Sequence, residues 1–264
     1  MPYIKVQGKN IFYRQNDKAI SHRPTILFVH GAGGTGEKWT NQLSGIKDYH
    51  LIALDLPGHG RSEGEAINSI QSYKESIWEF AQAMKLKSFV ITGHSMGGAI
   101  AMQFALDYPD WLKGLIIVDS GGRLRVNPVT LESLSRGEHP LESIQFSYSL
   151  KAASKTLEDA AEEMKAVSTQ VLLADFQACN NFNVIDSVQR INLPTLVICG
   201  QEDRMTPVKY SEYLAQKIPQ ASLMLIPDAG HMSMIEQPGA VNKAIMEFMM
   251  HSLKPAKRWG RVKV

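Results

Sequence analysis

One serine stands in a glycine-flanked pentapeptide, Gly93-His94-Ser95-Met96-Gly97, which fits the pattern G-x-S-x-G. The pentapeptide follows a short apolar run at 89–92 and opens a helical pattern that continues from Gly97. A sharp strand-to-helix turn would hold the Ser95 hydroxyl clear of a sheet, and the small flanking residues let such a turn pack. The context predicts that Ser95 is a nucleophile. A glycine-rich turn without chemistry is the alternative.

A serine hydroxyl needs a general base near neutral pH, and a carboxylate must orient that base. His231 is the best candidate because it follows the last predicted strand, in Asp228-Ala229-Gly230-His231-Met232. His30 and His59 lie in loops expected at the same edge of the sheet and are the alternatives. His94 is expected to point into the structure.

The carboxylate expected to orient the histidine is Asp203, which follows the predicted strand 195–198. Asp119 ends the predicted strand 115–118 and is the alternative acid. Glu202 is adjacent to Asp203 but would face the other way. The order Ser, Asp, His along the chain differs from the other common orders of such triads.

A glycine-rich loop, His30 to Gly36, follows the predicted strand 25–29 and can approach a ligand closely with its backbone. The N–H groups of Ala32 and Met96 are predicted to stabilise an oxyanion. The loop also fits the dinucleotide-binding spacing G-x-G-x-x-G through Gly31, Gly33 and Gly36. Asp55, about 20 residues further on, keeps that alternative open.

These residues need a scaffold that brings strand ends together. Short apolar runs alternate with helical patterns, which predicts a mostly parallel sheet with helices on both faces. The predicted strands are 3–7 and 11–15, which form an antiparallel hairpin, then 25–29, 51–54, 89–92, 115–118, 195–198 and 223–226. Helices are predicted near 37–47, 72–85, 96–107, 208–217 and 239–252.

The alternation of strands and helices stops between Ser120 and Asn192, where helices are predicted near 129–136, 140–152 and 157–178. We expect this all-helical segment to be a lid over the strand ends. Ser95 precedes the segment, whereas Asp203 and His231 follow it, so both flanks must share one sheet. The predicted organisation is a core of 1–120 and 192–253, a cap of 121–191 and a basic tail of 254–264.

Taken together, the motifs resemble the α/β-hydrolase fold, in its serine carboxylesterase-like branch with a small helical cap. The resemblance covers nearly the whole chain and rests on the His30-Gly31 loop, the segment from Asp55 to Ser62, the Ser95 turn, the Asp203 turn and Gly230-His231. It implies eight strands with the second antiparallel, a cap after the sixth, and a catalytic triad of Ser95, Asp203 and His231. Serine at position 95 excludes the aspartate-nucleophile dehalogenases of this fold.

The function implied by the resemblance and the residues is hydrolysis of a carboxylic ester with a small to medium acyl chain, through an acyl-enzyme. A carbon–carbon bond hydrolase or lyase on the same triad, and a receptor-like protein with slow turnover, are the alternatives. Methionines flank the triad positions, and such side chains adapt to irregular apolar ligands. The predicted substrate pocket comprises Gly31, Trp39, Phe146, Met205 and Met232.

Composition restricts the partners. The 264 residues include 28 basic and 26 acidic side chains, a net charge of +2 that gives no reason to expect nucleic acid or an acidic membrane as partner. Five of the basic residues lie in the last eleven positions, so the rest of the chain is mildly acidic. No signal layout or membrane-length apolar run is present, and Cys179 and Cys199 have no disulfide or metal-type spacing. We expect a cytoplasmic protein that takes a small acyl substrate and water, with no cofactor, metal or membrane insertion; the oligomeric state stays open.

Overall fold

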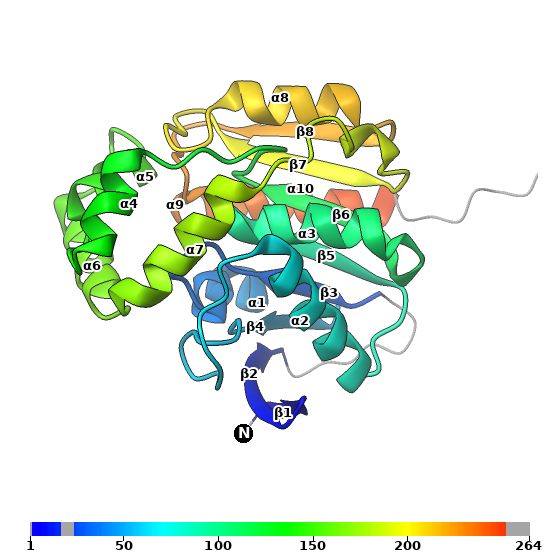
Figure 1. The fold of residues 1–264 in the computed structure, drawn as a ribbon. Helices are drawn as coiled ribbons and strands as arrows, with labels where there is room; N and C mark the ends of the chain where they lie inside the picture. Colours follow the sequence, from blue (N-terminus) through cyan, green and yellow to red (C-terminus); the bar gives the residue numbers. More distant parts are fainter. Residues whose placement is uncertain (1, 17–23, 252–264) are drawn as a thin grey trace, which may run out of the picture.

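The computed structural model describes residues 2–16 and 24–251, and in that part of the chain eight strands form one sheet (Figure 1). The strands are β1 (Tyr3–Val6), β2 (Lys9–Gln15), β3 (Ile26–Val29), β4 (Leu51–Leu54), β5 (Phe89–His94), β6 (Leu112–Val118), β7 (Thr195–Gly200) and β8 (Ala221–Ile226). Their order is β1-β2-β4-β3-β5-β6-β7-β8. β2 is antiparallel to both neighbours and the remaining neighbours pair in parallel, which confirms the predicted sheet.

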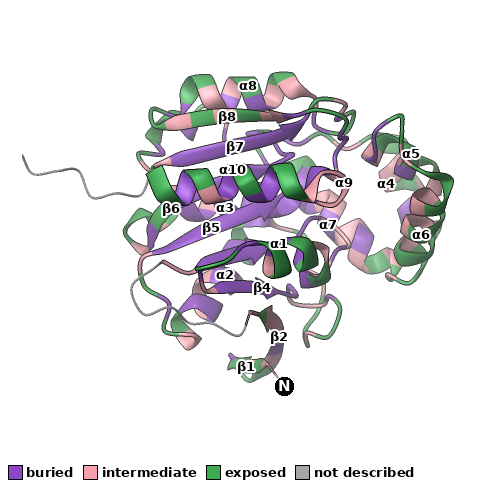
Figure 2. Ribbon diagram, turned by 180° about the vertical axis from the view of Figure 1, so that it is seen from behind, coloured by how far each residue is buried: buried purple, intermediate pink, exposed green. Residues whose placement is uncertain are grey.

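Helices cover both faces of this sheet. They are α1 (Thr40–Gly45), α2 (Ile70–Ala83), α3 (Met96–Asp107), α8 (Val208–Lys217) and α10 (Pro238–His251). In β3, Leu27 and Val29 pack in the hydrophobic layer that includes α2, α3 and α8, whereas Ile26 and Phe28 pack in the layer that includes α10. Successive strand residues point to opposite faces, so a sheet covered on both sides needs the continuous apolar strands seen in the sequence. Figure 2 shows the central strands buried between helices whose outer sides are exposed, whereas the edge strands β1 and β8 are partly exposed.

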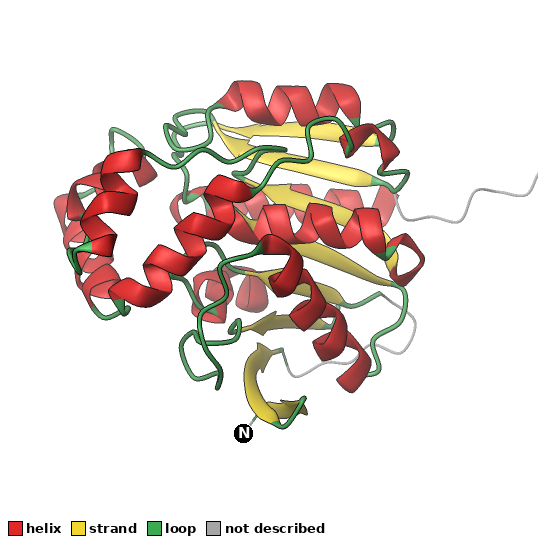
Figure 3. Ribbon diagram, in the orientation of Figure 1, coloured by secondary structure: helices red, strands yellow, loops and turns green. Residues whose placement is uncertain are grey.

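Between β6 and β7 the chain forms a group of helices, which we call the helical insertion (residues 119–194). Its helices are α4 (Pro128–Ser135), α5 (Ile144–Ser147), α6 (Ser154–Lys165) and α7 (Thr169–Asn181), and they lie together at one side of the sheet (Figure 3). The sequence predicted one helix over 157–178, and that was wrong. Helix α6 ends at Lys165, and α7 begins as a separate helix at Thr169. Ser168 is the N-cap of α7, because its side chain accepts a hydrogen bond from the Gln170 N–H.

Short helices complete the described structure: η1 (Gly36–Trp39), η2 (Pro109–Trp111), η3 (Leu141–Ser143), η4 (Val188–Arg190) and α9 (Ser233–Glu236). Within the described residues, no helix combines the length and the apolar character needed to cross a membrane. The predicted basic tail, 254–264, lies outside the described residues.

Candidate active site

Ser95 lies at the sharp turn between β5 and α3, with a positive φ of 51° that L residues rarely adopt. The turn is possible because its neighbours are glycines. A Cβ on Gly93 would overlap the carbonyl of Gly97, and a Cβ on Gly97 would lie 2.6 Å from the carbonyl oxygen of His30. The Ser95 N–H donates to the Val118 carbonyl (3.0 Å), and the Ser120 hydroxyl donates to the Ser95 carbonyl (2.7 Å). The strained turn is therefore held by the end of β6 and the residues that follow it, and the Ser95 side chain stays partly exposed.

His231 and Asp203 meet in the loops that follow β8 and β7. His231 Nδ1 lies 2.9 Å from Asp203 Oδ2, and both residues are buried. Burial disfavours the charged imidazolium, but the charge and hydrogen bond of Asp203 outweigh it and raise the pKa of His231 above its ordinary value. Burial likewise opposes ionisation of Asp203, yet His231 and the hydrogen bonds from Thr206 lower the pKa of this carboxyl. The pair thus has the polarity of a base held by a carboxylate.

Asp119, the alternative acid, has a different task. Its Oδ1 accepts the Gly200 N–H (2.8 Å), and its Oδ2 accepts the N–H and the hydroxyl of Ser233 (3.1 and 2.5 Å). These bonds tie the end of β7 to the start of α9. Burial and the nearby Asp203 charge raise the pKa of Asp119 to about 7. Glu202 does face away, because it accepts the N–H of Leu150 in the helical insertion.

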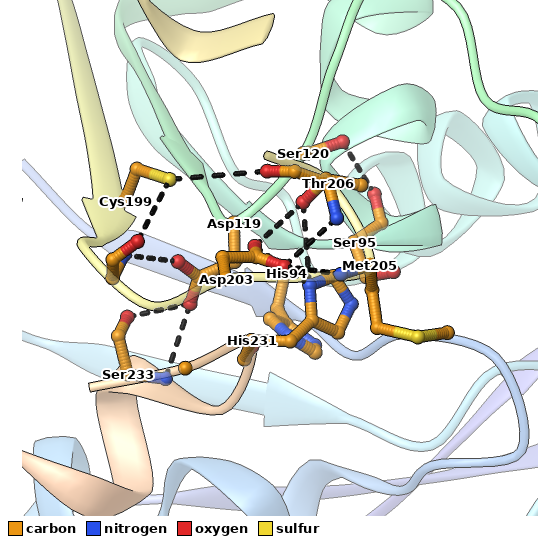
Figure 4. A network of polar contacts seen from close by, with 12 residues as sticks. His94, Ser95, Asp119, Ser120, Cys199, Asp203, Met205, Thr206, His231 and Ser233 are labelled. Carbon is orange, nitrogen blue, oxygen red and sulfur yellow. Dashed lines mark hydrogen bonds and ion pairs between the residues drawn. The ribbon is translucent and has the colours of Figure 1, made fainter. Parts of the chain in front are cut away.

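The residue before the nucleophile contacts the base directly. The His94 ring lies 4.9 Å from the His231 ring between centroids, and His94 Nε2 donates to the His231 carbonyl (2.8 Å). Burial and the charge of His231 lower the pKa of His94 to about 3, so His94 is neutral. Figure 4 shows Ser95, His231 and Asp203 in one network of polar contacts. Among the described residues, no hydrogen bond joins the Ser95 hydroxyl to His231.

The glycine-rich loop after β3 lies against the nucleophile. A Cβ on Gly31 would be 3.2 Å from Ser95 Cβ and 2.8 Å from His94 Nδ1, so only glycine allows this approach. The N–H groups of Ala32 and Met96 are not hydrogen-bonded to any described residue, and Met96 N–H is the first of α3. Within the described residues both N–H groups are therefore unengaged, and the predicted oxyanion hole stays a prediction.

The two alternative histidines are engaged elsewhere. The Leu56 N–H donates to His30 Nε2 (3.0 Å) and His30 Nδ1 lies 2.8 Å from the Gly31 carbonyl, so this ring is a neutral support of the loop. Burial, helped by His59, lowers the pKa of His30 well below its ordinary value. His59 Nε2 bonds Asp175 of α7 (2.8 Å). Sequence reasoning missed Asp175, although a lone acid three residues from Leu172 on an apolar helix side was a usable signal.

The dinucleotide alternative for the loop does not fit its surroundings. Asp55, the proposed ribose ligand, is fully buried and accepts hydrogen bonds from Gly36 N–H (2.8 Å), Arg61 N–H (3.0 Å) and the Arg14 guanidinium (2.9 Å). These bonds fold the loop onto the hairpin edge of the sheet. The Asp55 carboxylate is therefore not available to a ribose.

The predicted pocket residues divide into two groups. The prediction that Trp39 lines the substrate pocket is wrong. Trp39 is fully buried, and its ring centroid lies 4.9 Å from that of Phe28 in the hydrophobic layer that includes α10. Large indoles are driven into the core because they bury much apolar area. Phe146 is 43% exposed and Met205 36%, beside the Asp203 loop, with the Arg204 guanidinium over the Phe146 ring. Met232 is half-buried, and its N–H donates to Ser147 of the insertion (3.1 Å).

Among the described residues, a buried group of side chains has the ligand types of a metal site. Asp119, Cys199 and Asp203 each offer a ligand atom, and these atoms lie within 4.8 Å of one another. Their chemistry argues against that use. Both carboxylates already accept hydrogen bonds on each oxygen. Burial and the charge of Asp119 raise the pKa of Cys199 to about 12, which disfavours the thiolate that a metal would bind.

Comparisons with known proteins place this site in a family. The profile described as "Alpha/beta hydrolase family" matches residues 26–244. Lipase 3 of Moraxella sp. is 28% identical over 247 residues, covering 87% of this chain and 78% of that protein. A putative carbamate hydrolase, RutD, of Pseudomonas syringae is 26% identical over 242 residues, covering 86% and 93%.

Solved structures agree on the fold. A thermophilic esterase superposes with a TM-score of 0.82 at 30% identity, covering 94% of this chain and 96% of that one. The enol-lactonase of Burkholderia xenovorans LB400 gives a TM-score of 0.87 at 21% identity, covering 94% and 100%, a likeness of fold alone. With a strained serine turn, a histidine–aspartate pair and a profile that spans most of its length, this chain belongs to the alpha/beta hydrolase family.

Proposed function

We propose that this protein is a serine hydrolase that cleaves a carboxylic ester with a small to medium acyl chain, with Ser95, His231 and Asp203 as its triad. The observation that carries the proposal is the hydrogen bond of 2.9 Å between His231 Nδ1 and Asp203 Oδ2. It commits Nδ1 to the carboxylate and leaves Nε2 as the basic nitrogen. His94, bonded to the His231 carbonyl, keeps this histidine beside the serine turn.

In the proposed reaction the Ser95 hydroxyl attacks the acyl carbon while His231 Nε2 takes its proton. The carbonyl electron pair moves to oxygen, and the Ala32 and Met96 N–H groups stabilise that oxyanion, each by about 3–4 kcal/mol. The intermediate then expels the alcohol, which takes the proton from His231. Water, deprotonated by the same histidine, releases the acid from the acyl-serine. Asp203 stays ionised and stabilises the imidazolium.

The helical insertion takes the part of a cap in this proposal. Its segment 145–151 is fastened to the loops that carry the triad: Arg204 donates to Tyr148 O (3.2 Å), and the Ser149 N–H donates to Glu236 (2.8 Å). A Cβ on Gly230, next to the base, would lie 2.5 Å from the Tyr148 backbone. Phe146, Met205, Met232 and Gly31 are the proposed acyl-pocket residues: Gly31 lies against Ser95, Met232 follows His231, Met205 is in the Asp203 loop, and Phe146 lies under the Arg204 guanidinium of that loop.

The test is hydrolysis of nitrophenyl esters of increasing acyl length, beside the matching nitrophenyl carbamates because carbamate hydrolases are among the relatives. We expect wild type to hydrolyse the short and medium esters and Ser95→Ala to lose about 10⁴-fold or more in kcat. Ser44→Ala, at an exposed position of α1, is the matched control and keeps full activity.

Two results would contradict the proposal. Equal rates for wild type and Ser95→Ala on every ester would show that Ser95 is not the nucleophile. Turnover of the carbamates alone would keep the triad but change the substrate class. A fluorophosphonate probe that labels wild type and not Ser95→Ala measures the activated hydroxyl without reference to substrate.

A further inference from the structure

A buried carboxylate on the helical insertion binds three parts of the core at once. Asp175, on α7, is fully buried. Its Oδ1 accepts the Tyr73 hydroxyl of α2 (2.6 Å), and its Oδ2 accepts His59 Nε2 (2.8 Å) and the Gly33 N–H (2.7 Å). We call these groups the Asp175 cluster. These hydrogen bonds do not involve Ser95, His231 or Asp203, and the cluster has no place in the proposed proton transfers.

The geometry fixes the charges in this cluster. His59 Nδ1 lies 3.0 Å from the Pro57 carbonyl, and Nε2 faces the Asp175 carboxylate. Both neighbours can only accept, so both ring nitrogens must carry protons and His59 is an imidazolium. Burial opposes that charge, but the bond and charge of Asp175 outweigh it and raise the pKa of His59. Hydrogen bonds between charged partners are short and strong, so the His59–Asp175 pair is suited to holding neighbouring groups in a fixed position.

The third partner of Asp175 is the loop proposed to hold the oxyanion. Gly33 follows Ala32, and the Gly31 carbonyl on the other side of Ala32 lies 2.8 Å from His30 Nδ1 and 3.0 Å from the Gly34 N–H, which donates to it. The two peptide groups that flank Ala32 are thus held from opposite ends. Gly33 has a φ of +62°, and a Cβ there would overlap Leu172 of α7. One turn of α7 therefore both bonds and packs against this loop.

We propose that Asp175 is a positioning residue for the oxyanion hole: from the helical insertion it fixes the peptide after Ala32, so that the Ala32 N–H is aimed at the oxyanion only while α7 is seated. The inference rests on the proposed function, because it assigns a task to the same site. Donors that are already aligned need no reorganisation as charge develops. Loosening the loop therefore acts on the transition state more than on the bound ester.

The experiment is the kinetics of Asp175→Ala with the best nitrophenyl ester. We expect kcat to fall about 10- to 100-fold, the scale of a misplacement of about 1 Å, with KM within about twofold of wild type. An acyl trifluoromethyl ketone, which forms an oxyanion on Ser95, should lose affinity by a similar factor. Asp175→Asn keeps an accepting oxygen and should recover part of kcat.

The control for simple destabilisation is Leu134→Ala, a buried residue of α4, which packs against α7. It should lower the melting temperature and leave kcat within about twofold. If Asp175→Ala changes only the melting temperature, or changes KM and not kcat, the inference is overturned. If both Asp175 variants fail to fold, hydrogen exchange in wild type decides: strong protection of the Gly33 amide supports the inference, and exchange as fast as in an open loop overturns it.

The outcomes also separate this inference from the proposed function. Should wild type hydrolyse no ester, the proposed function fails. The rate of fluorophosphonate labelling at Ser95 then replaces kcat, since phosphonylation places negative charge on oxygen at the same donors. Slower labelling of Asp175→Ala supports the positioning task without any ester, and an unchanged rate overturns it.

Discussion

Replacing Asp203 by asparagine exchanges one oxygen for an NH₂ group and reverses the two hydrogen bonds made at that position, to His231 and to the Thr206 hydroxyl. Asp203 Oδ1 accepts the N–H groups of Met205 and Thr206, both at 2.8 Å. Because these two donors require an oxygen, the new amide must place its carbonyl there. Its NH₂ group then occupies the Oδ2 position, 2.9 Å from His231 Nδ1. Thr206 Oγ1, now 2.7 Å from Oδ2, can turn to accept from the amide.

The amide would donate to His231 Nδ1, whose partner in the wild-type protein is the Asp203 carboxylate. The imidazole must then carry its proton on Nε2, the nitrogen that has to receive the Ser95 proton. This wrong tautomer costs about 10⁴-fold in kcat in the general serine–histidine–aspartate template. At about 1.4 kcal/mol per factor of ten, the barrier rises by about 5.5 kcal/mol. Shape and packing hardly change, so we expect the melting temperature to stay within a few degrees.

The assay is steady-state hydrolysis of the best nitrophenyl ester from pH 5 to 9, with Asp119→Asn as the matched control. Asp119 bonds Gly200 and Ser233 rather than the imidazole, so its variant should keep kcat within about tenfold. The negative charge of Asp119 helps to raise the pKa of His231, so its removal should move the pH profile of Asp119→Asn toward lower pH. If Asp203→Asn keeps a tenth of wild-type kcat while Asp119→Asn loses activity, the acid is Asp119 and the reasoning is refuted.

Two further predictions use the same enzyme. Because only neutral His231 accepts a proton and its pKa is raised, kcat/KM should rise with pH and reach half its plateau above pH 6.5, the ordinary histidine value; a rate that is flat from pH 5 to 9 would contradict a histidine base. Gly97→Ala would place a Cβ 2.6 Å from the His30 carbonyl oxygen, so the serine turn and β3 must separate; kcat should fall about 100-fold and stability by about 1–3 kcal/mol. Gly239→Ala in α10, where a Cβ meets nothing within 4 Å, is its control and should unfold no more easily than wild type, as circular dichroism melts would show.

Local sequence patterns predicted most of the fold. The apolar strands predict burial on both faces, and the structure covers both faces with helices. The serine turn was recognisable because its glycines are a steric requirement that the chain must meet locally. The break between α6 and α7 was missed, since Ser168 and its neighbours look helical until the N-cap geometry is seen. Trp39 was misplaced because its type fits an entrance or a core equally well.

Local sequence patterns do not determine which residues of the candidate site pair with each other. The sequence offered three histidines and three acids at strand ends, and their chemistry alone could not separate them. The tertiary structure separates them by partner: His231 meets Asp203, His30 holds its own loop, and His59 meets Asp175. Such choices depend on distances of about 3 Å between segments more than 25 residues apart.

What the sequence determined by itself was the order of elements and the residue types at the strand ends, because periodicity and glycine sterics act within a few residues. What only the tertiary structure decided was which donors face which acceptors. Asp175 is the clearest case: no motif marks it, yet it lies 142 positions from Gly33 along the chain and 2.7 Å from its N–H in space. Hydrogen bonds select partners by distance and angle, and those are properties of the assembled fold.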